Sequence, residues 1–120
     1  MRVLIVDDST YIRSSLRTLL EQNGYEIVGE AKNGEMAIDL AMELSPDVIT
    51  LDNILPDMTG LDVLKTLNTD DFTSKVIMIS AVGHLSAIVD PMNNGAKHYL
   101  VKPFDNSELI AILKQLDEES

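Results

Sequence analysis

Residues 3–8 read Val-Leu-Ile-Val-Asp-Asp, an apolar run that ends in two carboxylates. Such a short aliphatic run is typical of a strand that is buried on both faces of a parallel sheet. Three further runs end in residues suited to phosphate chemistry: residues 48–51 before Asp52, residues 76–79 before Ser80, and residues 99–101 before Lys102 and Pro103. Ligands of open α/β sheets bind outside the carboxyl ends of the strands. We therefore expect these side chains to line one pocket.

Amphipathic helical patterns lie between the apolar runs. Together they predict one α/β domain over residues 1–120, with a five-stranded parallel sheet covered by helices on both faces. The expected strands are residues 3–6, 25–31, 48–51, 76–79 and 97–101, and the expected helices begin near residues 9, 34, 60, 84 and 105.

Local signals mark the ends of these helices. Ser9 or Asp8 is the expected N-cap of the first helix, and Gly24 its left-handed stop. Asp105 and Glu108 have the spacing of a capping box at the start of the last helix. Pro91 lies inside the helix expected over residues 84–94 and should kink or shorten it.

The formal net charge is -11, with 20 acidic and 9 basic residues. Direct binding to nucleic acid or to an anionic membrane surface is therefore not expected, because both require basic side chains. The sequence has no cysteine, no apolar span long enough for a membrane and no signal-peptide pattern. We expect a cytoplasmic, monomeric protein.

Asp7, Asp8 and Asp52 are the candidate metal ligands. Two adjacent carboxylates can simply cap a helix, but carboxylates buried together raise one another's pKa unless a cation neutralises them. Mg²⁺ prefers such oxygen ligands. Asp52 is the candidate nucleophile, since a carboxylate can attack phosphorus to give an acyl phosphate. The alternative for Asp52 is a turn-forming aspartate ahead of Pro56.

Lys102 and Ser80 complete the expected site. Lys102 is interpreted as a point charge that pairs with Asp52 and then with a phosphoryl oxygen, or alternatively as a surface lysine beside a turn. The Ser80 hydroxyl can donate to a phosphoryl oxygen or simply cap a strand end. His84 and His98 lack the spacing and the cysteine partners of a metal site, so we do not expect them to be ligands.

The ordered set of these pieces resembles a response-regulator receiver domain of two-component signalling, over essentially the whole chain. The pieces are residues 6–8, 52–60, 80–81, 95–96 and 99–104. Residues 29–34 and 80–83 resemble most the single-domain chemotaxis response regulators (CheY-like). The resemblance implies a flavodoxin-like, doubly wound (βα)5 fold with strand order 2-1-3-4-5. It also implies that Lys102-Pro103 is a cis peptide bond.

The resemblance further implies a chemical role for each site residue. Asp52 would accept a phosphoryl group from the phosphohistidine of a histidine kinase. Asp8, Asp52 and the backbone carbonyl of Ile54 would bind Mg²⁺ directly, and Asp7 would act through water. Lys102 would neutralise charge on the transferring group. Self-phosphotransfer and autodephosphorylation are the only reactions implied, so the chain is not expected to be an enzyme.

A switch is implied as well. Ser80 would turn to the phosphoryl oxygen and Tyr99 would turn inward, which changes the surface formed by the fourth helix, fifth strand and fifth helix. That surface would bind a downstream target such as the flagellar motor switch. The apolar Ile54 side chain is predicted to shield the acyl phosphate from water and to slow its hydrolysis.

Several alternatives stay open from the sequence. The chain can be a phosphorelay intermediate, a receiver cut from a longer regulator, or an interaction module that is never phosphorylated. A phosphatase of the haloacid dehalogenase type needs a second aspartate two residues after the nucleophile, but Ser9 follows Asp7 at that spacing and Ile54 follows Asp52. A flavin carrier of the same fold needs a Ser/Thr-rich phosphate loop after the first strand, whereas Asp7 and Asp8 follow that strand here and would repel a phosphate in the absence of a metal.

Overall fold

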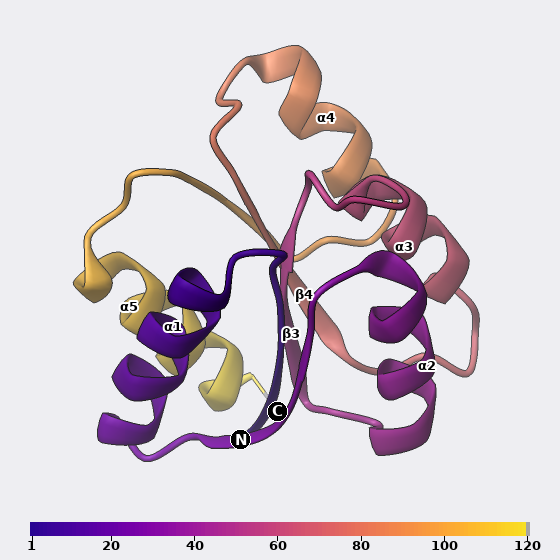
Figure 1. Ribbon diagram of the computed structural model, residues 1–120. Helices are drawn as coiled ribbons and strands as arrows, with labels where there is room; N and C mark the ends of the chain where they lie inside the picture. Colours follow the sequence, from indigo (N-terminus) through magenta and orange to yellow (C-terminus); the bar gives the residue numbers. More distant parts are fainter. Residues whose placement is uncertain (120) are drawn as a thin grey trace.

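The computed structural model describes residues 1–119. A single parallel sheet lies at its centre and helices cover both faces, as Figure 1 shows. The strands are β1 (Arg2–Val6), β2 (Glu26–Ala31), β3 (Val48–Asp52), β4 (Lys75–Ser80) and β5 (His98–Val101). The helices are α1 (Thr10–Gln22), α2 (Gly34–Leu44), α3 (Gly60–Leu67), α4 (Leu85–Asn93) and α5 (Asn106–Glu118).

The strand order is β2-β1-β3-β4-β5, and every pair is parallel. This confirms the flavodoxin-like topology that the sequence resemblance implies. β1 and β3 are neighbours near the centre, so residues that follow β1 lie beside residues that follow β3. The register between β1 and β2 shifts once, between Val3 and Leu4.

Two apolar cores fill the space between the sheet and the helices. In Figure 1, α1 and α5 lie on one side of the sheet, and α2 and α3 on the other. The side chains of each strand alternate between the faces, so Val3 and Ile5 join the first core while Leu4 and Val6 join the second. Both faces of β1, β3 and β4 are buried, which explains their uninterrupted apolar sequences.

Every expected strand differs from the observed one by a single residue at one end or both. β1 and β4 begin one residue earlier than expected, β3 and β4 end one residue later, and β2 and β5 begin one residue later. Tyr25 lies in the turn before β2, where its N–H donates to the Leu20 carbonyl at 3.0 Å. Lys97 lies just before β5, although its N–H still donates to the Val76 carbonyl at 2.8 Å. These residues satisfy their backbone hydrogen bonds at the ends of strands, where sequence patterns define a boundary least sharply.

Helix ends follow the local chemistry of the sequence. Of the two candidates for the first N-cap, Ser9 is the one that caps α1: its hydroxyl accepts from the Ile12 N–H at 3.2 Å. Gly24 has φ +85°, as expected for a left-handed stop. The Glu108 carboxylate accepts from the Asp105 N–H at 3.1 Å, as in the expected capping box.

The helix that contains Pro91 differs from its expected range. α4 spans Leu85–Asn93, one residue shorter at each end than expected, and it continues through Pro91. Pro91 is buried near the C-terminal end of this helix. No helix among residues 1–119 is both long enough and apolar enough to cross a membrane.

Candidate phosphoryl-acceptor site

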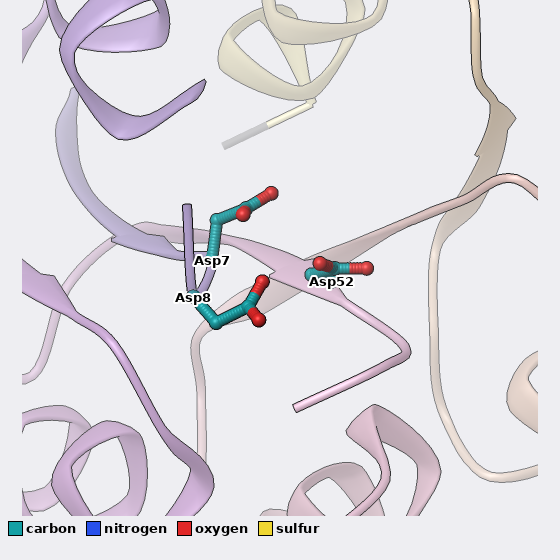
Figure 2. Close-up of side chains that lie close together, drawn as sticks. All are labelled: Asp7, Asp8 and Asp52. Atoms are coloured by element: carbon teal, nitrogen blue, oxygen red, sulfur yellow. The ribbon is translucent and has the colours of Figure 1, made fainter. Parts of the chain in front are cut away.

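Three carboxylates lie together at the carboxyl ends of β1 and β3. Figure 2 shows Asp7, Asp8 and Asp52 with their side chains in one cluster. One carboxylate oxygen from each residue lies within 4.8 Å of the others. Asp7 and Asp52 are buried, whereas Asp8 is exposed. The sheet topology thus brings together the acidic residues that the sequence predicts, with one side open to solvent.

Lys102 supplies the positive charge of this site from the end of β5. Its Nζ lies 3.2 Å from Asp7 Oδ2 and 3.7 Å from Asp52 Oδ2. The sequence predicts a pairing with Asp52, and the structure adds a shorter one with Asp7. The ammonium group therefore bridges two carboxylates that lie 45 positions apart in the sequence. The peptide bond between Lys102 and Pro103 is cis, as the sequence resemblance implies.

The environment of Asp52 opposes its ionisation. Burial raises the pKa of Asp52 above its ordinary value of 3.8, and the neighbouring Asp7 charge raises it further. Lys102 and the Ile54 N–H act in the opposite direction. That N–H donates to Asp52 Oδ1 at 3.3 Å. The net effect is a raised pKa, so an additional positive charge nearby would favour the ionised form of Asp52.

The carboxylate cluster fits a hard divalent cation. Carboxylate oxygens are the ligands that Mg²⁺ prefers, and it keeps several waters, which suits the open side at Asp8. A cation would also offset the mutual repulsion of Asp7 and Asp52. Ile54, whose backbone carbonyl is the third expected ligand, follows Asp52 closely in the chain and forms an isolated antiparallel bridge with Thr59. The donor set of these residues therefore suits the ion that the sequence predicts.

Ser80 and Tyr99, the two expected switch residues, both bind the same peptide segment. The Ser80 Oγ accepts from the Val82 N–H at 3.1 Å. The Tyr99 hydroxyl donates to the Val82 carbonyl at 2.6 Å. Ser80 is buried at the end of β4, and Tyr99 is half-buried in β5. The two side chains thus hold the loop between β4 and α4 from its two sides.

Two charged residues that the sequence analysis does not identify position the acidic loops. Arg13 on α1 donates to the Asp7 carbonyl oxygen and lies 3.4 Å from the Glu30 carboxylate. Asp57 accepts hydrogen bonds from the N–H groups of Gly34 and Glu35. The contacts of Asp57 with α2 and of Arg13 with Glu30 join segments far apart in the sequence, so no local pattern predicts them.

The histidines lie outside the acidic cluster. His84 is the exposed N-cap of α4, and His98 is half-buried in β5. In the described part of the chain, the group of acidic or histidine residues close enough to hold a metal ion contains Asp7, Asp8 and Asp52.

Comparison with known proteins identifies the family. A family model described as the response regulator receiver domain matches residues 3–114. The chemotaxis protein CheY of Thermotoga maritima is 38% identical over 98% of this chain and 98% of its own length. CheY of Bacillus subtilis is 40% identical over 97% of this chain and 98% of its own length.

Solved structures agree with the sequence relatives. A chain in the crystal structure of the CheX-CheY-BeF3-Mg+2 complex from Borrelia burgdorferi matches with a TM-score of 0.92 and 32% identity, over 97% of this chain and 88% of that chain. A CheY-like receiver domain protein from Methanospirillum hungatei matches with a TM-score of 0.88 and 31% identity, over 98% and 94% of the two chains. This chain therefore belongs to the response regulator receiver domain family.

Proposed function

We propose that this protein is a phosphoacceptor signalling domain, in which Asp52 takes a phosphoryl group from the phosphohistidine of a histidine kinase. The observation that carries the proposal is the setting of Asp52. Its carboxylate is buried with a lysine ammonium 3.7 Å away and belongs to a cluster of three carboxylates that suits Mg²⁺. The similar structure from Borrelia burgdorferi is described as a complex with BeF3 and Mg²⁺.

The transfer itself is a displacement at phosphorus. A carboxylate oxygen of Asp52 forms the new O–P bond while the P–N bond to the donor imidazole breaks, and the bonding electrons return to the imidazole nitrogen. Lys102, already shared between Asp7 and Asp52, lies within reach of the incoming phosphoryl oxygens. When bound, Mg²⁺ supplies positive charge that offsets the negative charge of the phosphoryl oxygens.

Asp8 and Asp52, with the Ile54 carbonyl, would hold the ion directly, and Asp7 would act through water. The Asp7 carboxylate also accepts from the Ser9 N–H at 2.9 Å, so its orientation is fixed from two sides. The only reactions proposed are this transfer and the hydrolysis of the resulting acyl phosphate. The phosphoryl acceptor is the protein itself, so we do not assign an enzymatic function.

A switch would follow from the shared contacts of Ser80 and Tyr99. If the Ser80 side chain rotates so that its hydroxyl donates to a phosphoryl oxygen on Asp52, its Oγ moves away from the Val82 N–H that donates to it now. The segment at Val82 then loses one of its two side-chain contacts, and its hold on the Tyr99 hydroxyl weakens. The charge change at Asp52 would thereby reach α4 and β5 through a single peptide segment.

The face formed by α4, β5 and α5 is the proposed binding surface for the downstream target. Apolar side chains at helical spacing along α4 are left exposed, together with one on β5: Leu85, Val89, Met92 and Val101. Exposed apolar side chains that are grouped in this way are typical of protein-binding surfaces. Because the similar proteins from Thermotoga maritima and Bacillus subtilis are chemotaxis proteins, we propose that the target belongs to chemotaxis, such as the flagellar motor switch. The protein would act as a cytoplasmic monomer.

Intact-mass measurement after incubation with Mg²⁺ and acetyl phosphate tests the proposal. The wild type should gain the mass of one phosphoryl group, and Asp52→Asn should gain none. Asp39→Asn is the matched control, because it makes the same substitution at an exposed position on α2 and should behave as the wild type. Phosphorylation of Asp52→Asn, or of neither protein, would contradict the assignment of Asp52.

Hydrogen exchange tests the switch separately. Peptides that cover the loop after β4 and the start of α4 should exchange differently once the wild type is phosphorylated. The same peptides of Asp52→Asn should not change under identical conditions. Unchanged exchange in a fully phosphorylated wild type would leave phosphoacceptor function intact and would overturn the proposed coupling through Val82.

A further inference from the structure

The Asp57 carboxylate connects the loop after β3 to the start of α2 by two hydrogen bonds. Its Oδ1 accepts from the Gly34 N–H at 2.8 Å, and its Oδ2 accepts from the Glu35 N–H at 3.0 Å. Gly34 and Glu35 are the first two residues of α2, whereas Asp57 lies in the loop between β3 and α3. The carboxylate therefore caps a helix that begins 23 residues earlier in the chain.

The cap at this end of α2 is shared between two residues. The Asn33 side chain accepts from the Met36 N–H at 2.8 Å, and the Asn33 carbonyl accepts from the Ala37 N–H at 3.1 Å. Together with the two bonds to Asp57, all four N–H groups of the first turn have partners. Removal of Asn33 or Asp57 would cost the helix a similar kind of contact, but only Asp57 belongs to the acidic site's loop.

The loop over residues 53–59 is held rigidly at its base. The Gly60 N–H donates to the Asn53 carbonyl at 2.7 Å, and a Cβ at Gly60 would lie only 2.4 Å from the Asp52 carbonyl oxygen. The bridge between Ile54 and Thr59 adds a second constraint across the loop. These backbone contacts fix the base of the loop directly behind Asp52.

The tip of the same loop rests on α2. A Cβ at Gly34 would lie 2.3 Å from Met58 Cγ, so the absence of a side chain at Gly34 lets Met58 approach. Asp57, next to Met58, adds its two hydrogen bonds at the same place. Packing and hydrogen bonding thus join the loop tip to the first turn of α2.

We propose that Asp57 is a positioning residue for the cation site, which sets the direction of the Ile54 carbonyl by tying the loop to α2. This inference rests on the proposed function, in which Ile54 contributes its carbonyl to Mg²⁺. Ile54 is only three residues from Asp57, inside a loop whose base is already fixed. Without the tip contact, the bridge to Thr59 and the bond from its N–H to Asp52 would be the remaining restraints on Ile54, so its carbonyl is the ligand whose direction should change. Partners that orient metal ligands typically change metal affinity about 10-fold or more when they are removed.

The decisive measurement is the Mg²⁺ dissociation constant, obtained by calorimetric titration of the intact protein without any phosphoryl donor. Asp57→Ala should raise this constant about 10-fold. Asn33→Ala is the matched control, because it removes a cap from the same helix end and leaves the loop in place. We expect Asn33→Ala to lower the melting temperature and to keep the wild-type affinity for Mg²⁺.

Two further variants separate anchoring from charge. Glu35→Gln removes one negative charge from the same helix end and keeps both backbone bonds to Asp57, so it should bind Mg²⁺ like the wild type. Asp57→Asn retains one carbonyl oxygen as an acceptor and should give an intermediate affinity. Equal weakening by Glu35→Gln and Asp57→Ala would show that only charge matters and would overturn the inference.

A third readout follows the loop and the phosphoryl transfer together. In Asp57→Ala, the amide resonances of Gly34, Glu35 and Ile54 should shift, and phosphorylation should need a Mg²⁺ concentration about 10-fold higher to reach half of its maximal rate. An unchanged Mg²⁺ affinity in Asp57→Ala, alongside a wild type that binds Mg²⁺ and is phosphorylated, would overturn the role of Asp57 alone. Failure of the wild type in both assays would instead overturn the proposed function.

Discussion

At the scale of single residues, the burial of Asp52 sets the stability of the fold against the function proposed for this carboxylate. Burial, with the adjacent Asp7 charge, raises the pKa of Asp52 above 3.8, its ordinary value. Between 3.8 and the higher pKa of the folded state, the folded protein holds a proton that the unfolded chain has released. The free energy of unfolding therefore falls as the pH rises through that range, and the ionised carboxylate destabilises the fold at neutral pH.

Asp52→Asn should accordingly increase the free energy of unfolding at neutral pH in the absence of divalent cations. The gain should vanish below pH 3.8, where Asp52 is protonated in both states. Urea unfolding of the wild type and the variant at both pH values measures it. A gain that is independent of pH would show that the cause is something other than the ionisation of Asp52.

The hydroxyl of Thr50 gives a second prediction at this scale. Thr50 is buried in β3, and its Oγ1 has no hydrogen-bond partner among the described residues. Thr50→Val keeps the shape and removes the unsatisfied group, so it should raise the free energy of unfolding by about 1 kcal/mol. Thr18→Val, at an exposed hydroxyl that donates to the Ser14 carbonyl, should give no gain in the same urea titration. A loss at Thr50→Val would mean that its hydroxyl does have a partner.

Ile54 gives the third prediction at the scale of single residues. Its side chain is 63% exposed, and its N–H donates to the Asp52 carboxylate. If this side chain shields the acyl phosphate from water, Ile54→Asn should shorten the half-life of the phosphoryl group, whereas Ile54→Leu should retain it. The decay of phosphorylated mass after removal of acetyl phosphate provides the half-life. Equal half-lives for Ile54→Asn and the wild type would contradict shielding.

At the scale of elements, the end of α2 stores a small strain. Ser45 is its C-cap and has φ +45°, which places a residue with a side chain in the left-handed region. This conformation costs about 1–2 kcal/mol, and glycine avoids that cost but loses roughly 0.5–1 kcal/mol in chain entropy. Ser45→Gly should therefore raise the free energy of unfolding by about 0.5 kcal/mol. Ser45→Ala keeps the Cβ and should show no such gain in the same thermal or urea unfolding experiment.

The elements were largely predictable because their signals are local. Ser9 precedes the first turn that it caps, and Gly24 lies where α1 must stop. The pairings between elements were not predictable in the same way. The contact of Asp57 with Gly34 depends on how far apart α2 and the loop after β3 lie, and the sequence does not encode that distance in any short pattern.

In the candidate site too, residues with a local sequence signal were predictable and residues placed by long-range contacts were not. Asp7, Asp52 and Lys102 each follow an apolar run, so the common edge of a parallel sheet predicts that they meet. Arg13 lies within a helix and contacts Glu30 of a neighbouring strand, so its role becomes visible only when the helix is placed on the sheet. Side chains at strand ends were therefore predictable, and those that brace the loops from helices were not.

At the scale of the whole molecule, a cation that binds only the folded site must stabilise the fold. A Mg²⁺ concentration 100 times its dissociation constant should raise the free energy of unfolding by about 2.7 kcal/mol. Thermal unfolding with MgCl₂, compared with NaCl at equal ionic strength, separates this effect from screening of the net charge of -11. Asp8→Ala should lose most of the Mg²⁺-specific increase. An equal increase with NaCl would contradict specific binding.

The bridge from Lys102 to Asp7 spans 95 positions of the chain. During synthesis, the first strand and the acidic cluster leave the ribosome long before the lysine that completes them. A nascent chain that ends before residue 102 contains the three carboxylates without their partner ammonium group. If Lys102 is needed for phosphoryl transfer, as proposed, a chain whose synthesis stops before residue 102 should not be phosphorylated on Asp52.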